Sequence, residues 1–171
     1  MQMVIKVLAI LLVIWGSVIG FAPKKELYYA LEKFLQPRGV VIADESLREK
    51  PWGFEIDHGK LIVKGVQIGH FEAISVLPLL VYNRVELRGF APAKGIARFF
   101  PVKIRKGVAV YALWHPGQVE FYAEGNFGKV KGFYDVWKRK LHLRWIEVGD
   151  ISALRSYLIK KKEGWIYERK F

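Results

Sequence analysis

The chain opens with an apolar run of the length that crosses a lipid bilayer. Residues 7–22 contain no charged side chain, and residues 3–5 extend the run past the single charge of Lys6. Counted from residue 3, about 20 residues at ~1.5 Å each match the ~30 Å thickness of the hydrocarbon core. A lysine near a helix end can extend its ammonium group to the lipid headgroups. The pattern therefore predicts a transmembrane anchor over residues 1–22.

A cleaved signal peptide is the alternative interpretation of this run. Gly20 and Ala22 fit the small-x-small pattern of a cleavage site. Proline at position 23 would then be the first residue of the mature protein, where it is expected to obstruct cleavage. Lys6 is also the only basic side chain before the run. Both features favour an uncleaved anchor.

The charges on either side of the run bear on membrane orientation. Lys6 and the α-amino group precede it, whereas Lys24, Lys25 and Lys33 follow it. By the positive-inside rule, this distribution would keep the C-terminal part of the chain in the cytoplasm. A periplasmic location must therefore be argued from something other than local charge.

The segment after the run has the spacing of an amphipathic helix. Pro37 and Gly39 are expected to end it. We expect this short helix within residues 23–39, packed on a core or lying along the membrane. Its apolar side chains recur three and four residues apart at Leu27, Ala30, Leu31, Phe34 and Leu35.

From residue 40 onward the apolar period changes from 3.6 to 2, as in β-strands. Phe54 and Ile56 precede a turn-forming cluster at residues 57–59, so this region is interpreted as a hairpin with its turn there. Gly65 suggests a β-bulge in the returning strand. Further alternation occurs at residues 82–89 and 102–105.

The clearest alternation lies in residues 119–145, which predict a β-meander that is apolar on one face and charged on the other. A turn at residues 125–128 pairs Glu124 with Lys129 and Tyr122 with Lys131 across the first hairpin. The candidate apolar binding face consists of Val119, Phe121, Val130, Tyr134, Leu141, Leu143 and Trp145.

The C-terminal residues predict one more helix and one more strand. Asp150 can cap a short helix near residues 150–161, and residues 164–167 begin a strand. The fold class is therefore mainly β with a few helices: a transmembrane helix over 1–22, a helix within 23–39, and a single antiparallel, curved sheet over 40–171.

Composition narrows the chemistry. The absence of cysteine excludes disulfides, thiolate metal sites and cysteine nucleophiles. Among the histidines, His58, His70, His115 and His142, none forms an HxH or HxxxH pair. No serine occupies a GxSxG motif, and no glycine-rich phosphate loop is present. We expect no catalytic residue, no metal site and no cofactor.

The net charge of +12 suits either an anionic membrane surface or nucleic acid. Tethering favours the membrane, because an anchored domain always lies close to lipid headgroups. Phe99 and Phe100 are flanked by basic residues, a composition that also occurs in strips that bind single-stranded nucleic acid. No recognised RNA-binding signature accompanies them, and a basic strand face is the simpler interpretation. This candidate basic patch comprises Lys94, Arg98, Lys103, Arg105 and Lys106.

The overall layout resembles a known family. An N-terminal anchor leads to a short helix, then to a glycine-flanked strand pair at residues 59–68, a Gly-Asn-Phe-Gly turn at 125–128 and a Leu-His-Leu strand at 141–143. This pattern resembles the type II secretion system N protein and the wider AsmA-like group of bacterial envelope proteins. The resemblance implies an inner-membrane anchor, a periplasmic curved sheet with an apolar face suited to acyl chains, and protein partners in the envelope.

These observations predict a non-enzymatic, single-pass protein of the bacterial inner membrane with a periplasmic C-terminal domain. It would serve as a scaffold or accessory component in a secretion-system or lipid-related assembly, with membrane lipid and envelope proteins as partners. Self-association through a sheet edge is a further expected contact. The alternative is a cytoplasm-facing basic domain that binds nucleic acid or anionic lipid.

Overall fold

The computed structural model describes residues 24–79, 81–161 and 164–171. The predicted anchor over residues 1–22 lies outside this part of the chain. Within the described part, no helix has both the length and the apolar character needed to cross a membrane.

The helices are short and lie at the margins of the sheet. Helix α2 (Lys24–Leu35) lies where the helical spacing predicts one, and η1 (Gln36–Arg38) follows it directly. Gly39 ends this segment with a φ of 72°, a backbone conformation that glycine adopts at little cost. The other two are α3 (Lys94–Ala97) and η2 (Arg155–Tyr157).

The described residues form one sheet of eleven strands, in which every pairing is antiparallel. The strands from β3 to β9 follow one another as neighbours, which is a meander. The strands are β1 (Val40–Ala43), β2 (Ser46–Lys50), β3 (Gly53–Val63), β4 (Val66–Pro78), β5 (Tyr82–Pro92), β6 (Ile104–Ala112), β7 (Gln118–Gly125), β8 (Gly128–Asp135), β9 (Lys140–Val148), β10 (Ile159–Lys161) and β11 (Gly164–Lys170).

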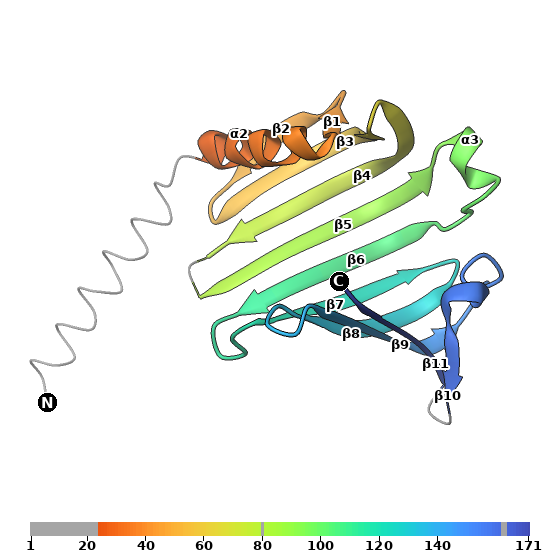
Figure 1. Cartoon of the computed structure of the whole chain (residues 1–171). Coiled ribbons are helices and arrows are strands. Elements are labelled where there is room, and N and C mark those ends of the chain that lie inside the picture. The colour runs from red at the N-terminus through yellow and green to blue at the C-terminus, as the bar shows by residue number, and fades with distance from the viewer. Residues whose placement is uncertain (1–23, 80, 162–163) are drawn as a thin grey trace, which may run out of the picture.

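The sheet is open and its two ends differ. Both β1 and β2 pair with β3 at one end, whereas β11 pairs with β9 and β10 with β11 at the other. The sheet curves, so that β9 and β11 lie in a different plane from β4 and β5 (Figure 1). The predicted fold, mainly β with a single antiparallel sheet, is confirmed for the described residues.

The predicted hairpin turn at residues 57–59 is wrong, because β3 runs through these residues without a break. The turn lies at Lys64 and Gly65, whose φ values of 50° and 79° are those of a two-residue hairpin turn. Gly65 is therefore a turn residue and not a bulge. His58 has a φ of 50° within β3, which is a local distortion of a continuing strand.

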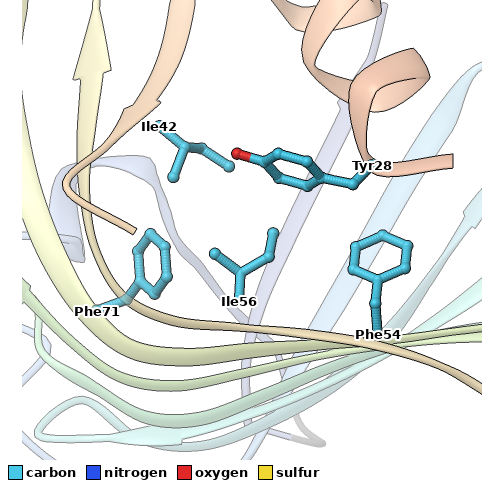
Figure 2. Packing of buried hydrophobic residues seen from close by; sticks show 5 residues of the cluster. All are labelled: Tyr28, Ile42, Phe54, Ile56 and Phe71. Atoms are coloured by element: carbon cyan, nitrogen blue, oxygen red, sulfur yellow. The ribbon is translucent and has the colours of Figure 1, made fainter. Parts of the chain in front are cut away.

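One hydrophobic cluster lies between α2 and the first strands. It is built around Ile56, which is fully buried, with Leu31 and Leu35 of α2 packed against it. Figure 2 shows the side chains of Phe54, Ile56 and Phe71 rising from β3 and β4 toward Tyr28 of the helix and Ile42 of β1. The buried members of this cluster, called the α2 cluster here, are Tyr28, Ile42, Phe54, Ile56 and Phe71.

A second cluster lies under residues 151–158. Leu154 and Leu158 pack onto it from above. The predicted helix near 150–161 is reduced to the 3₁₀ turn η2, because Ile159–Lys161 pair with β11 as strand β10. Asp150 still accepts a hydrogen bond from the backbone N–H of Ser152 at 3.1 Å. The buried members of this C-terminal cluster are Val102, Phe127, Val130 and Trp145.

Candidate functional site

Both clusters lie on the same face of the sheet, and a row of cross-strand neighbours connects them. Residues paired in register point to the same face. The row runs from the α2 cluster to the C-terminal cluster through Val76, Val85, Ala109, Phe121, Gly132 and Leu143. This side of the sheet is called the apolar face below.

The seven residues of the predicted binding face do share this side of the sheet. The register pairs Val119 with Tyr134 and Tyr134 with Leu141. It also places Phe121 opposite Gly132 and Gly132 opposite Leu143. The alternation in the sequence therefore assigns each of these side chains to the correct face.

Two of the seven are covered by the chain itself. Val130 and Trp145 are buried in the C-terminal cluster, and Leu143 packs against that cluster. Among the described residues, neither cluster includes the side chains between them. These form the central strip: Val85, Ala109, Val119, Phe121, Tyr134 and Leu141.

The central strip is an open apolar surface. Val85 is exposed, and the other five side chains are half-buried. The strip crosses five strands, β5 to β9, a distance of roughly 20 Å at ~4.8 Å per strand. At one end the ring of Tyr134 meets the ring of Phe171, with 6.4 Å between their centroids.

The opposite, polar face carries a buried carboxylate. Glu55 is only 3% exposed. It accepts hydrogen bonds from the Lys50 ammonium at 2.7 Å, from the Arg88 guanidinium at 2.8 Å and from the Ser75 hydroxyl. Arg48 adds a second guanidinium at 3.8 Å. The bonds from Lys50 and Ser75 outweigh the effect of burial and lower the pKa of Glu55 to about 2.

Other glutamates on this face are paired with basic residues in the same way. Glu86 lies 2.6 Å from Arg84 and 3.5 Å from Lys106. Burial alone would raise the pKa of Glu86, but the hydrogen bond from Arg84 and the charge of Lys106 lower it. Much of the positive charge on the polar face is therefore balanced locally.

Two shallow cavities open along the sheet. One, of about 500 Å³, lies over β6 to β9 and is lined by alternating apolar and charged side chains, among them Tyr122, Lys131 and Phe133. The other, of about 570 Å³, lies beside the Asn126 turn and includes Glu72 and Lys129. Opposite charges line the second cavity, so it has no single electrostatic preference.

The candidate basic patch extends from α3 through the following connection into β6. Lys94 lies in α3, and Arg98 directly follows it; Lys103 lies in the connection to β6. Phe99 and Phe100 are exposed between them. These residues form the connection between β5 and β6.

The remaining two members of the patch lie inside the sheet and have acidic partners. Arg105 lies 3.1 Å from Glu124, and Lys106 lies 3.5 Å from Glu86. Of the five basic residues, Lys103 and Arg105 line the same cavity, the one of about 570 Å³. The patch does not converge on one groove in the way that a nucleic-acid site requires.

Two histidines of the described part lie beside glutamates. His142 is 2.9 Å from Glu168 and packs at a tilt against Phe133, with 5.5 Å between ring centroids. His115 lies 3.5 Å from Glu120. Across the residues that the structure describes, no three histidine, aspartate or glutamate side chains are placed to hold a metal ion together.

The Glu55 cluster was not predicted from the sequence. The sequence pattern that could have indicated this cluster is a glutamate between Phe54 and Ile56, two apolar residues that point to the other face. The cationic partners come from β2 and β5, and no local spacing places these strands on either side of β3 and β4.

No family model, curated protein or solved structure matches this chain. The class that the fold defines is therefore an open, antiparallel β-meander with one partly covered apolar face. The resemblance to AsmA-like envelope proteins remains an expectation that rests on the sequence pattern.

Proposed function

We propose that this chain is a non-enzymatic, single-pass protein of the bacterial inner membrane that binds lipid acyl chains on the central strip. In this role it is an accessory component of a secretion-system or lipid-related assembly, with its sheet on the periplasmic side. The observation that carries the proposal is the central strip, an apolar surface left open between two covered clusters.

The composition of the strip suits a flexible hydrocarbon ligand. Phe121 and Tyr134 provide rings on the neighbouring strands β7 and β8, while Ala109 of β6 and Gly132 of β8, on either side of Phe121, keep the floor beside its ring low. Burial of a methylene group contributes about 0.8 kcal/mol, so an acyl chain lying along several strands gains affinity with its length. The strip contains no charged side chain, so an uncharged hydrocarbon chain can bind there without leaving a buried charge unpaired.

The edges of the sheet are less suited to a partner than the strip. Edge strand β10 is three residues long and presents Lys160 and Lys161. At the other end, β2 presents Arg48, Glu49 and Lys50, and β1 is apolar but only four residues long. Short edge strands with charged side chains discourage the addition of another strand. We therefore assign protein recruitment and self-association a lesser role than lipid contact.

A photo-crosslinking residue at Phe121 tests the proposal in the full chain, expressed in membranes. Phe121 lies on the central strip, whereas Phe133 is a half-buried aromatic residue on the polar face and serves as the matched control. We expect benzoylphenylalanine at position 121, and not at position 133, to form adducts with the mass of a phospholipid. Lipid adducts at neither position, or equally at both, would contradict the proposal.

Membrane topology requires a separate measurement. A reporter that is active only in the periplasm, fused after Phe171, should be active. A reporter that is active only in the cytoplasm should be silent at the same position. The reverse result would place the sheet in the cytoplasm, as the lysines after residue 22 suggest by the positive-inside rule.

A further inference from the structure

The turns at one end of the strands form a continuous edge. In a meander, the turn between β2 and β3 lies at the same end as those between β4 and β5, β6 and β7, and β8 and β9. The C-terminus reaches this end too, because Lys170 pairs with Lys140 at the start of β9. The turn edge is defined here as residues 51–52, 79, 81, 113–117, 136–139 and 171.

Backbone hydrogen bonds connect neighbouring turns along this edge. The N–H of Leu113 donates to the carbonyl of Val81 at 3.0 Å. The N–H of Val136 donates to the carbonyl of Gly117 at 2.8 Å, and the N–H of Phe171 to the carbonyl of Arg139 at 2.9 Å. These contacts join the β4–β5, β6–β7 and β8–β9 turns to one another and to the C-terminus.

Exposed tryptophans concentrate on the turn edge. Trp52, Trp114 and Trp137 are 53%, 63% and 79% exposed, and each lies in a different turn. The other tryptophans of the described part, Trp145 and Trp165, are buried or half-buried in the C-terminal cluster. Exposed Leu113, Val136 and Phe171 add apolar surface beside the rings.

The chain enters the described structure at this same end. Lys25, in the first turn of α2, lies 3.9 Å from Glu49, which is next to the β2–β3 turn. Figure 1 shows the start of α2 on the side of the molecule where β4 ends and β5 begins. A single residue, number 23, separates the predicted anchor from α2, and one residue spans at most about 3.6 Å.

We propose that the turn edge docks on the surface of the membrane in which the chain is anchored, with its tryptophans among anionic lipid headgroups. This inference rests on the anchor of the proposed function. Tryptophan favours the membrane–water interface because its ring is apolar and its N–H is polar. Exposed Lys138, Arg139 and Lys170 supply positive charge for the anionic headgroups.

Docking would fix the direction of the sheet relative to the bilayer. The strands run away from the turn edge, so the opposite turns, including Val66 and Phe99, would point away from the membrane. In the central strip, Val119, Tyr134 and Leu141 lie one residue from the turn-edge ends of their strands, so the strip would open beside the headgroups. An acyl chain could then pass from the bilayer to the strip over a short distance.

The absence of cysteine permits a direct test with single spin labels on the full chain. Val136→Cys places a nitroxide on the turn edge, and Val66→Cys is the matched control at the other end of the strands; the two valines are 44% and 55% exposed. Each labelled chain is reconstituted in vesicles of phosphatidylcholine with phosphatidylglycerol. Oxygen and a water-soluble nickel complex then report on depth.

We expect the ratio of oxygen to nickel accessibility to be higher at position 136 than at position 66. Vesicles of phosphatidylcholine alone should reduce this difference. Trp114→Ser with Trp137→Ser should lower the ratio at 136 to that at 66, while the chain still floats with the vesicles. Unchanged circular dichroism of these variants would show that the sheet remains folded.

The outcomes separate this inference from the proposed function. Flotation with equal, aqueous ratios at positions 136 and 66 would overturn docking and leave the anchor intact. A chain that does not float with vesicles would contradict both. Protection of position 136 only in native membranes that contain other proteins would assign the edge to a protein partner and overturn docking on lipid. Equal insertion in neutral vesicles would overturn the role of anionic lipid.

Discussion

Replacement of Glu55 by glutamine should destabilise the fold in a way that depends on pH. The change removes one negative charge and leaves the Lys50 ammonium and the Arg88 guanidinium without this anion. Arg48 keeps its contact with Asp57 at 2.7 Å. Glutamine keeps nearly the same shape, so the packing of Phe54 and Ile56 on the other face should be unchanged.

The magnitude follows from the lowered pKa. Glu55 titrates near 4.5 in an unfolded chain and at about 2 in the fold. At about 1.4 kcal/mol per pH unit, the full difference would be worth roughly 3 kcal/mol. The cationic partners are themselves about half exposed to water, which screens the interaction. We therefore expect a loss of about 1–2 kcal/mol at pH 7, or a Tm lower by about 2–8 °C for a chain of this size.

The sign of the pH dependence follows from the direction of the shift. A carboxylate whose pKa is lowered by folding contributes its full stabilisation above its unfolded pKa. The contribution is lost as the pH falls from about 4.5 toward about 2. The difference between the native chain and Glu55→Gln should therefore shrink to less than half between pH 7 and pH 3.

Thermal unfolding of the full chain in detergent micelles, followed by circular dichroism at both pH values, measures this difference. Glu49→Gln is the control, because Glu49 is exposed and its lysine partner lies 3.9 Å away. Its replacement should change the Tm little. A Glu55→Gln chain as stable as the native one at pH 7, or a deficit that does not shrink at pH 3, would refute the proposed role of the carboxylate.

Three further predictions test other parts of the fold by the same unfolding assay. The Lys129 ammonium lies 2.7 Å from the Glu147 carboxylate. Lys129→Glu alone and Glu147→Lys alone should each lower the Tm, and the double variant should restore it. Additive losses in the double variant would show that the pair is not coupled. An added Cβ meets no atom within 4 Å at Gly65 or at Gly95, so these two sites differ in backbone conformation and not in space. Gly65→Ala should lower the stability by about 1–2 kcal/mol, because the φ of 79° at Gly65 is left-handed. Gly95→Ala is the control and should leave the stability unchanged. Leu154→Ala should cost about 1–3 kcal/mol by opening the C-terminal cluster, and an unchanged Tm would mean that the segment does not contribute to the core.

The sheet was predictable from the sequence where one face is apolar and the other charged. In residues 119–145 the alternation predicts the register correctly, including Glu124 opposite Lys129, because a slip by one residue would turn every apolar side chain to water. The same logic fails at residues 57–59. A short polar cluster there has the composition of a turn, yet the strand continues because Asp57 and Gly59 pair with Ala73 and Phe71 of β4.

The covered part of the apolar face could not be predicted in the same way. Val130 and Trp145 have the same alternation as Phe121 and Tyr134, but residues 151–158 fold back over the first pair and leave the second pair open. Alternation assigns a side chain to a face and carries no information on what covers that face. The ion pair of Glu124 shows a related limit, since its partner at 3.1 Å is Arg105 of β6 and not the opposite residue Lys129.

The distribution of charge bears on the choice between lipid and nucleic acid. The chain has 28 basic and 16 acidic side chains. Five glutamates each lie beside a lysine or arginine: Glu55, Glu86, Glu124, Glu147 and Glu168. Much of the basic surplus lies toward the two ends of the strands, at the connection that carries Lys94 and Arg98 and at the turn edge that carries Lys138 and Arg139. A groove for nucleic acid needs cations that converge with aromatic rings, whereas a bilayer surface needs them spread along an edge. The turn edge combines cations spread along its length with three exposed tryptophans, and it lies where the chain leaves the predicted anchor. We therefore assign the basic side chains of the turn edge to contact with the membrane.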